Sequence, residues 1–134
     1  RTAQLALAWH LHDGDEGIIF GDQTTPTKML LGEAYVRHAE MVQRCIHIRF
    51  GLPGQLPPAL KKKVKRIDCA MAATEALQLA GYQESEIRKM SGLAIPSRPM
   101  PISLIPKPPS LAAREWLDKL RELLALHDAE ARNY

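Results

Sequence analysis

The chain has few cysteines, few aromatic residues and no long apolar run. Its 134 residues include two cysteines, and aromatic residues make up 5%. Cys45 and Cys69 both fall within helical patterns that predict burial, so we interpret them as reduced core residues of a cytoplasmic protein. No apolar run approaches the roughly 20 residues of a membrane span, and no signal-peptide pattern begins the chain. So few aromatic residues provide little material for stacking single-stranded nucleic acid.

Apolar residues are plentiful, at 46% of the chain, which is enough for one domain with a core of its own. Helical periodicity predicts helices over 2–13, 31–50, 59–80, 84–90 and 110–131, with a further short helix that begins at Pro26. A proline-rich connector from Pro96 to Pro109 is predicted to run extended over the bundle before the last helix. The expected fold is therefore an all-α bundle of about five or six helices.

Three predictions concern how these helices are buried. The apolar stripe of the 31–50 helix includes Tyr35, His38 and Cys45, and we interpret His38 as a core histidine in preference to a ligand. His47 is expected at the surface. The stripe of the last helix ends at His127 and is predicted to dock on the core or on a second subunit, which makes a homodimer one expectation.

Chemistry-bearing side chains are densest between His12 and Lys28. Leu5, Trp9, His12 and Glu16 share one helical stripe, which places an imidazole and a carboxylate on a face that the apolar residues mark as buried. Buried polar groups need partners. A divalent cation would suit His12 and the adjacent Asp13. The alternative is that His12 to Glu16 are only the polar end of the helix, where the chain passes into a solvent-exposed loop.

The start of the next predicted helix adds groups that suit a phosphate. Pro26 is placed at its first turn, with Thr24 or Thr25 available as the N-cap. A helix N-terminus, two hydroxyls and Lys28 would then face the same region as Glu16, and helix N-termini bind phosphate readily. The alternative is that Thr25 only caps the helix and that Lys28 is only solvated.

Two further carboxylates, Glu75 and Asp68, lie on one side of the 59–80 helix two turns apart. We interpret Glu75 as a structural or supporting acid, whereas the position of Asp68 calls for a partner. Asp68 lies beside Val64 and Met71, on a stripe predicted to be buried. A carboxylate there is costly unless it is paired or bound to a metal. As a plain core residue, Asp68 would need an arginine partner.

Two motifs resemble the signatures of HD-domain metal-dependent phosphohydrolases, most closely the branch that includes bacterial 5'-deoxynucleotidases. The first motif consists of His12-Asp13, Glu16, Gly21-Asp22, Pro26 and Lys28. The second consists of Val64 to Asp68 with Thr74-Glu75. Both occur in the family's order, and the resemblance covers about residues 3–80.

The resemblance implies a single HD-like helical domain over 1–134 that hydrolyses a nucleotide or a related phosphomonoester. One divalent ion (Mn, Co, Fe, Ni, Zn or Mg) would be held by His12, Asp13 and Asp68. The family's first metal-binding histidine has no counterpart among residues 1–11, so N-terminal residues are expected to be missing. The remaining implied roles are the positioning or deprotonation of water by Glu16 and Asp22, and phosphate binding by Thr24, Thr25 and Lys28.

Two other functions stay open. One is a catalytically inactive HD fold that serves as a binding or assembly module. The other is a basic helical nucleic-acid binder that uses the run from Lys61 to Arg66. We interpret that run as a solvated helix face, because only part of it can face one way. The net charge of +3 suits an anionic small molecule without demanding nucleic acid, and no membrane partner is expected.

Overall fold

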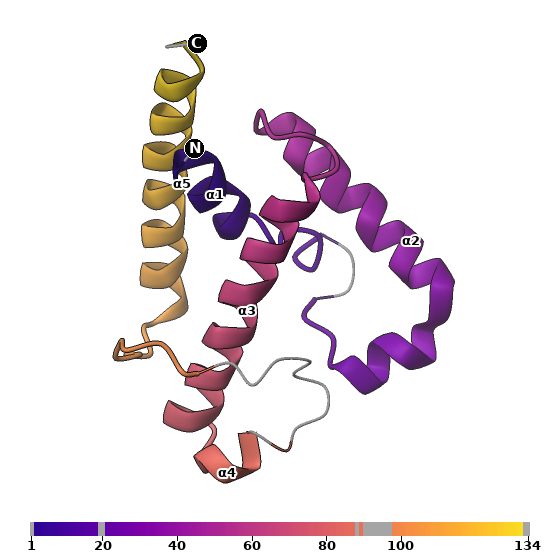
Figure 1. Ribbon diagram of the computed structural model, residues 1–134, viewed down its shortest axis with the longest axis vertical. Helices are drawn as coiled ribbons and strands as arrows, with labels where there is room; N and C mark the ends of the chain where they lie inside the picture. The colour runs from indigo at the N-terminus through magenta and orange to yellow at the C-terminus, as the bar shows by residue number, and fades with distance from the viewer. Residues whose placement is uncertain (1, 19–20, 88, 90–97, 133–134) are drawn as a thin grey trace.

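The chain is all-α in a computed structural model that describes residues 2–18, 21–87, 89 and 98–132 (Figure 1). The helices are α1 (Thr2–His10), α2 (Thr25–Arg49), α3 (Pro58–Gln78), α4 (Glu84–Ile87) and α5 (Pro109–Arg132). No residue in these described ranges belongs to a strand. The predicted fold class is confirmed, and the helix bounds fall close to those expected. The predicted end of the fourth helix at Met90 lies outside the described residues.

The core forms where α1 lies between α3 and α5 (Figure 1). Leu7 and Leu11 are 0% and 2% exposed, and they pack in one cluster with Val64 of α3 and Leu120 and Leu123 of α5. Burial of large aliphatic side chains is the main favourable term in folding. This packing fixes the end of α1, from which the residues 12–16 continue.

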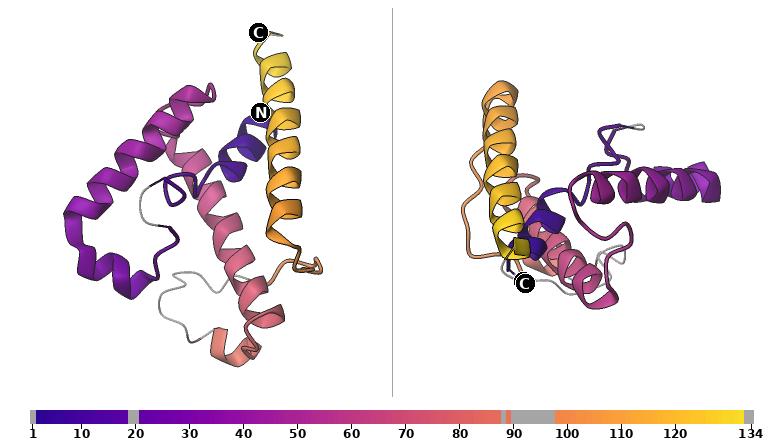
Figure 2. Two further views of the ribbon diagram at one scale, coloured as in Figure 1. Left: turned by 180° about the vertical axis from the view of Figure 1, so that it is seen from behind. Right: turned by 90° about the horizontal axis from the view of Figure 1, so that it is seen from above.

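Helix α2 projects away from the other helices, as the view from above shows (Figure 2). Its C-terminal end reaches the core through Ile46 and Phe50, which pack against the buried cluster. The helix bends at Gly32, whose φ of 71° lies in the left-handed region that glycine adopts without a steric penalty. The bend separates the short helix expected at Pro26 from the longer one that follows.

The predicted burial along α2 is largely wrong. Tyr35 is buried, but His38 and Cys45 are exposed and Met41 is 54% exposed. His47, expected at the surface, is 6% exposed. The reason is that an apolar stripe in the sequence predicts which face of a helix is buried but not how many of its turns pack against other helices. Only the last turns of α2 lie on the core. Cys69 is buried as predicted, and both cysteines are free, as predicted.

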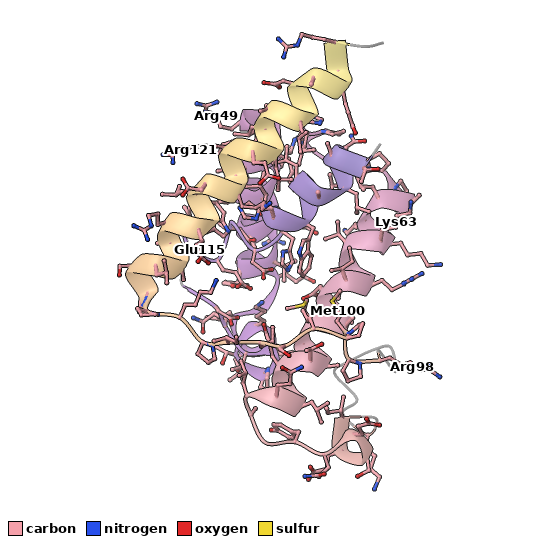
Figure 3. All side chains as sticks on the ribbon, turned by 90° about the vertical axis from the view of Figure 1, so that its left-hand side faces the viewer. Arg49, Lys63, Arg98, Met100, Glu115 and Arg121 are labelled. Carbon is pink, nitrogen blue, oxygen red and sulfur yellow. The ribbon has the colours of Figure 1, made fainter. Side chains whose placement is uncertain are left out.

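The proline-rich connector is extended over its described part, 98–108, and lies along α3 near Met100 (Figure 3). The Met100 N–H donates to Thr74 Oγ1 at 2.8 Å. The Gln78 side chain donates to the Ile102 carbonyl at 2.7 Å and accepts from the Leu104 N–H at 2.9 Å. Polar side chains of α3 therefore bind the backbone of the connector, which in a β-sheet would pair with the backbone of a neighbouring strand. Pro96 lies outside the described residues.

The basic run of α3 is exposed except for Val64, which is buried, and Lys63 points away from the bundle (Figure 3). The exposure of these basic side chains agrees with a solvated face and does not distinguish it from a nucleic-acid-binding face. Within the described ranges, the structure contains no helix with the length and apolar character to cross a lipid bilayer.

Candidate functional site

The His12 ring is oriented by the last turn of α1. It stacks on the Trp9 indole with ring centroids 4.1 Å apart, and its Nδ1–H donates to the Trp9 carbonyl at 2.7 Å. That bond selects the tautomer and leaves Nε2 to face the neighbouring acids. Metal-binding histidines usually have this arrangement, with one ring nitrogen held by a backbone carbonyl or a carboxylate.

The three predicted metal ligands meet at His12 Nε2. Asp13 Oδ2 lies 3.0 Å from Nε2, and Asp68 Oδ1 lies 3.7 Å from it. The other Asp68 oxygen accepts from the Lys65 ammonium at 2.5 Å. Residues from two distant segments are thus brought together by the packing of α1 on α3. The sequence predicted that Asp68 would need an arginine partner if it were only a core residue, and the cation beside it is instead Lys65.

The pKa values in this group are shifted because one imidazole, that of His12, faces the carboxylates of both Asp13 and Asp68. Burial opposes the positive charge of His12, but the nearby carboxylates of Asp13 and Asp68 outweigh it and raise the pKa of His12 to about 10. The ion pair with His12, helped by the hydrogen bond from Lys65, lowers the pKa of Asp68 to about 2. At neutral pH the proton on Nε2 occupies the space between the two carboxylates.

A metal ion would have to replace that proton. Ligand atoms that bind one ion at about 2.1 Å lie roughly 3 to 3.5 Å apart, which is close to the separations measured at Nε2. Among the described residues, however, no group of three or more His, Cys, Asp or Glu side chains encloses a point suited to a metal ion. The donor set of one imidazole and two carboxylates therefore suits a divalent ion in its chemistry, but its arrangement in this structure is not that of a closed metal site.

A second ion pair lies beside this cluster in sequence. Lys28 Nζ is 2.8 Å from Glu16 Oε1, and the Glu16 side chain is 16% exposed. The bond to Glu16 raises the pKa of Lys28. The structure thus joins two predicted site residues from opposite ends of the 17–25 loop. It places the Lys28 ammonium at the first turn of α2, where it is paired with Glu16.

Asp22 and Thr24 belong to neither ion-paired group. Both are exposed in the loop before α2. Thr24 is the N-cap of α2, as expected, but its side chain makes no capping bond and its Oγ1 lies 2.9 Å from Thr27 Oγ1. The backbone of Thr25 begins α2, and the Thr25 side chain lies outside the described part of the chain.

Gln43 is a site residue that sequence reasoning missed. Its Nε2 donates to the Leu11 carbonyl at 2.7 Å, and its Oε1 accepts from the Asp15 N–H at 3.3 Å. It therefore ties α2 to the backbone on both sides of His12. Nε2 also donates to His47 Nε2 at 2.9 Å, and burial lowers the pKa of His47. The sequence feature that could have indicated this contact is the spacing of Gln43 and His47, which are four residues apart and therefore share one face of the helix.

Gly14 allows the turn that follows His12 to pack closely on α2. A Cβ at this position would lie 3.0 Å from Ile46 Cδ1 and 3.2 Å from the Leu11 carbonyl oxygen. The first contact is with the end of the Ile46 side chain, which can move, and the second is with a backbone oxygen slightly closer than ordinary van der Waals contact. A larger residue at this position would therefore crowd the turn between Leu11 and α2.

Comparison with known proteins identifies a relative but no activity. No family model matches the chain. An uncharacterized protein of Rhodobacter capsulatus is 38% identical over 109 residues, which make up 80% of this chain. The chain spans about half the length of that relative, 55% of it. The function has to be argued from the site itself.

Proposed function

We propose that this protein is an HD-type metal-dependent phosphohydrolase that acts on a phosphomonoester. The observation that carries the proposal is the meeting of His12, Asp13 and Asp68 at one imidazole nitrogen, with separations of 3.0 and 3.7 Å. These residues come from the two motifs that resemble the family's signatures. A chance cluster of polar side chains would not be expected to combine residues from both motifs.

The ion would be held by His12 Nε2, Asp13 Oδ2 and Asp68 Oδ1, with further ligands from water or from residues beyond this group. When bound, it would supply Lewis-acid polarisation of a phosphoryl oxygen and of the attacking water. Trp9 keeps Nε2 directed at the site through its carbonyl, which accepts the Nδ1–H at 2.7 Å. Lys65 occupies the other oxygen of Asp68 and so keeps Oδ1 turned toward His12.

The Glu16–Lys28 pair would serve the substrate and the water. Water adds to phosphorus, the bond to the leaving alcohol oxygen breaks, and the alkoxide takes up a proton, which gives inorganic phosphate and an alcohol. Glu16 would position the water and accept its proton, with its carboxylate oriented by Lys28. The same proton would pass to the leaving alkoxide, with the Asp22 carboxylate as the relay. Lys28 and the Thr24 hydroxyl would bind phosphate oxygens.

Metal content tests the proposal directly. Protein purified without added metal is compared with Asp68→Ala and Asp68→Asn by mass spectrometry, and each is assayed for phosphate release from nucleoside monophosphates. We expect a bound divalent ion and hydrolysis in the natural chain, and at least a tenfold loss of affinity and activity in both variants. Glu122→Ala is the matched control, since Glu122 is an exposed acid of α5 outside both motifs and, like Asp68, pairs with a lysine three residues before it.

The opposite outcome would favour a different role. If no ion binds after loading with each metal in turn, the hydrolase proposal is wrong and an inactive HD fold that binds a partner becomes the better account. One observation favours that second role: Met29 and Leu30 at the start of α2 are 78% and 88% exposed. Exposed apolar clusters of this kind mark interaction surfaces more often than isolated residues do.

A further inference from the structure

Both tryptophans of the chain line the same cleft. The sequence contains two tryptophans, and Trp9 and Trp116 border a cleft of about 510 Å³ between the end of α1 and α5. His12 and Asp13 line it as well. The two indole side chains therefore lie next to the residues that would hold the metal ion.

Two stacked aromatic pairs build the walls of the cleft. His10 stacks on Trp116 with ring centroids 4.6 Å apart and an interplanar angle of 21°, and His10 Nε2 donates to the Trp116 carbonyl at 3.0 Å. Trp9 stacks on His12 in the same way on the other side. These contacts fix the indoles on rigid helices, and Trp116 remains 43% exposed.

The floor of the cleft lacks side chains. Gly14 and Gly17 line it, and a Cβ at Gly17 would have only the Gly14 carbonyl oxygen within 4 Å, at 3.9 Å. A side chain at Gly17 would enter open space beside the aromatic residues, whereas one at Gly14 would point toward Ile46 of α2. A planar ring is the ligand shape that flat aromatic walls and a bare backbone floor accommodate best.

We infer that this cleft binds the base of a nucleotide substrate, with Trp116 as the residue that stacks on it. The inference rests on the proposed function, because it places the phosphate end of the same molecule at the His12 cluster. Trp116 lies on α5, outside the two motifs that carry the family resemblance.

Tryptophan fluorescence tests the inference without metal or hydrolysis, because both indoles report on this cleft. We expect adenosine and uridine, which carry no phosphate, to quench the emission saturably. Ribose and inorganic phosphate should leave it unchanged. Calorimetric titration of the same nucleosides provides an affinity that does not depend on the number of tryptophans.

The variants separate stacking from folding. Trp116→Leu should weaken nucleoside binding tenfold or more, because base stacking on an aromatic ring supplies much of the affinity. Trp116→Phe should retain binding within about threefold. Leu117→Ala is the matched control, since Leu117 is the next residue of α5 and is 46% exposed. Circular dichroism confirms that each variant is folded.

The results distinguish failure of the cleft from failure of the hydrolase. Nucleoside binding in a protein that binds no metal and releases no phosphate would support the cleft and refute the proposed activity. Phosphate release without nucleoside binding, or equal affinity in Trp116→Leu and the natural chain, would overturn the inference. If Trp116→Leu instead turns a dimer into a monomer in sedimentation without changing nucleoside affinity, Trp116 is a subunit contact and the inference is wrong.

Discussion

At the scale of single residues, His12 shows how one side chain can be prepared for a cation. Its Nδ1–H is committed to the Trp9 carbonyl, and its Nε2 faces two carboxylates. The same geometry that stabilises a proton on Nε2 would stabilise a metal ion there, since both are held by the charges of Asp13 and Asp68. The proton and the ion therefore compete for one position.

This competition predicts that metal binding releases a proton. The pKa of His12 is raised to about 10, so the imidazole is protonated at pH 8 in the metal-free protein and must lose about one proton to become a ligand. Calorimetric titration with Mn²⁺ at pH 8, in two buffers of different ionisation enthalpy, measures the number released. His12→Asn should release none. Tight binding without proton release in the natural chain would show that His12 is not a ligand.

At the scale of elements, the sequence predicted where helices begin and end but not which of them cover one another. Pro26, the Gly51 to Pro58 loop and the connector prolines act locally, through backbone geometry, and the bounds that they predicted were confirmed. Burial along α2 depends on what packs against it. His38 and Cys45 were therefore assigned to a core that does not reach them, while His47 was assigned to the surface.

In the candidate site too, the sequence motifs predicted some residues, whereas contacts between helices could not be predicted from them. His12, Asp13 and Asp68 were predicted as one group because a resemblance linked two distant motifs, and the structure places them together. Gln43 carried no such motif. Its role exists only because the end of α2 packs against the turn after α1, which brings its amide to the Leu11 carbonyl. Spacing within one helix cannot show that contact between elements.

Gln43 provides a prediction about how α2 supports the site. Gln43→Ala removes the bonds to the Leu11 carbonyl and the Asp15 N–H, and it should lower the free energy of unfolding by about 1–3 kcal/mol, the cost of leaving partly buried partners unmet. Metal affinity should fall as well, because the turn that carries Asp13 loosens. Urea unfolding and metal titration measure the two effects.

The exposed neighbour Arg44 supplies the control. Arg44→Ala changes α2 at the next position and should leave both stability and metal affinity nearly unchanged. Equal losses in the two variants would show that α2 matters only as a helix and that the Gln43 amide has no specific role.

At the scale of the whole molecule, the histidines make folding stability depend on pH in opposite directions. Burial lowers the pKa of His10 and His47, so the unfolded chain takes up their protons first as the pH falls below about 6.5. The stability that these two residues contribute in neutral form is lost with acid. His12 behaves in the reverse way: its contribution is fully present below about pH 6.5 and is lost as the pH rises toward 10.

The metal-free protein should therefore be most stable near neutral pH and should weaken on both sides. The alkaline loss is expected to be on the order of 2 kcal/mol between pH 7 and 10, after a discount for the exposure of Asp13. Urea unfolding across this range measures it. His12→Asn should flatten the alkaline side and leave the acid side between about pH 4 and 6.5 unchanged, because His10 and His47 remain. A natural chain whose stability stays constant from pH 7 to 10 would contradict the His12 ion pairs, since the loss of the His12 charge is expected to weaken folding over this range.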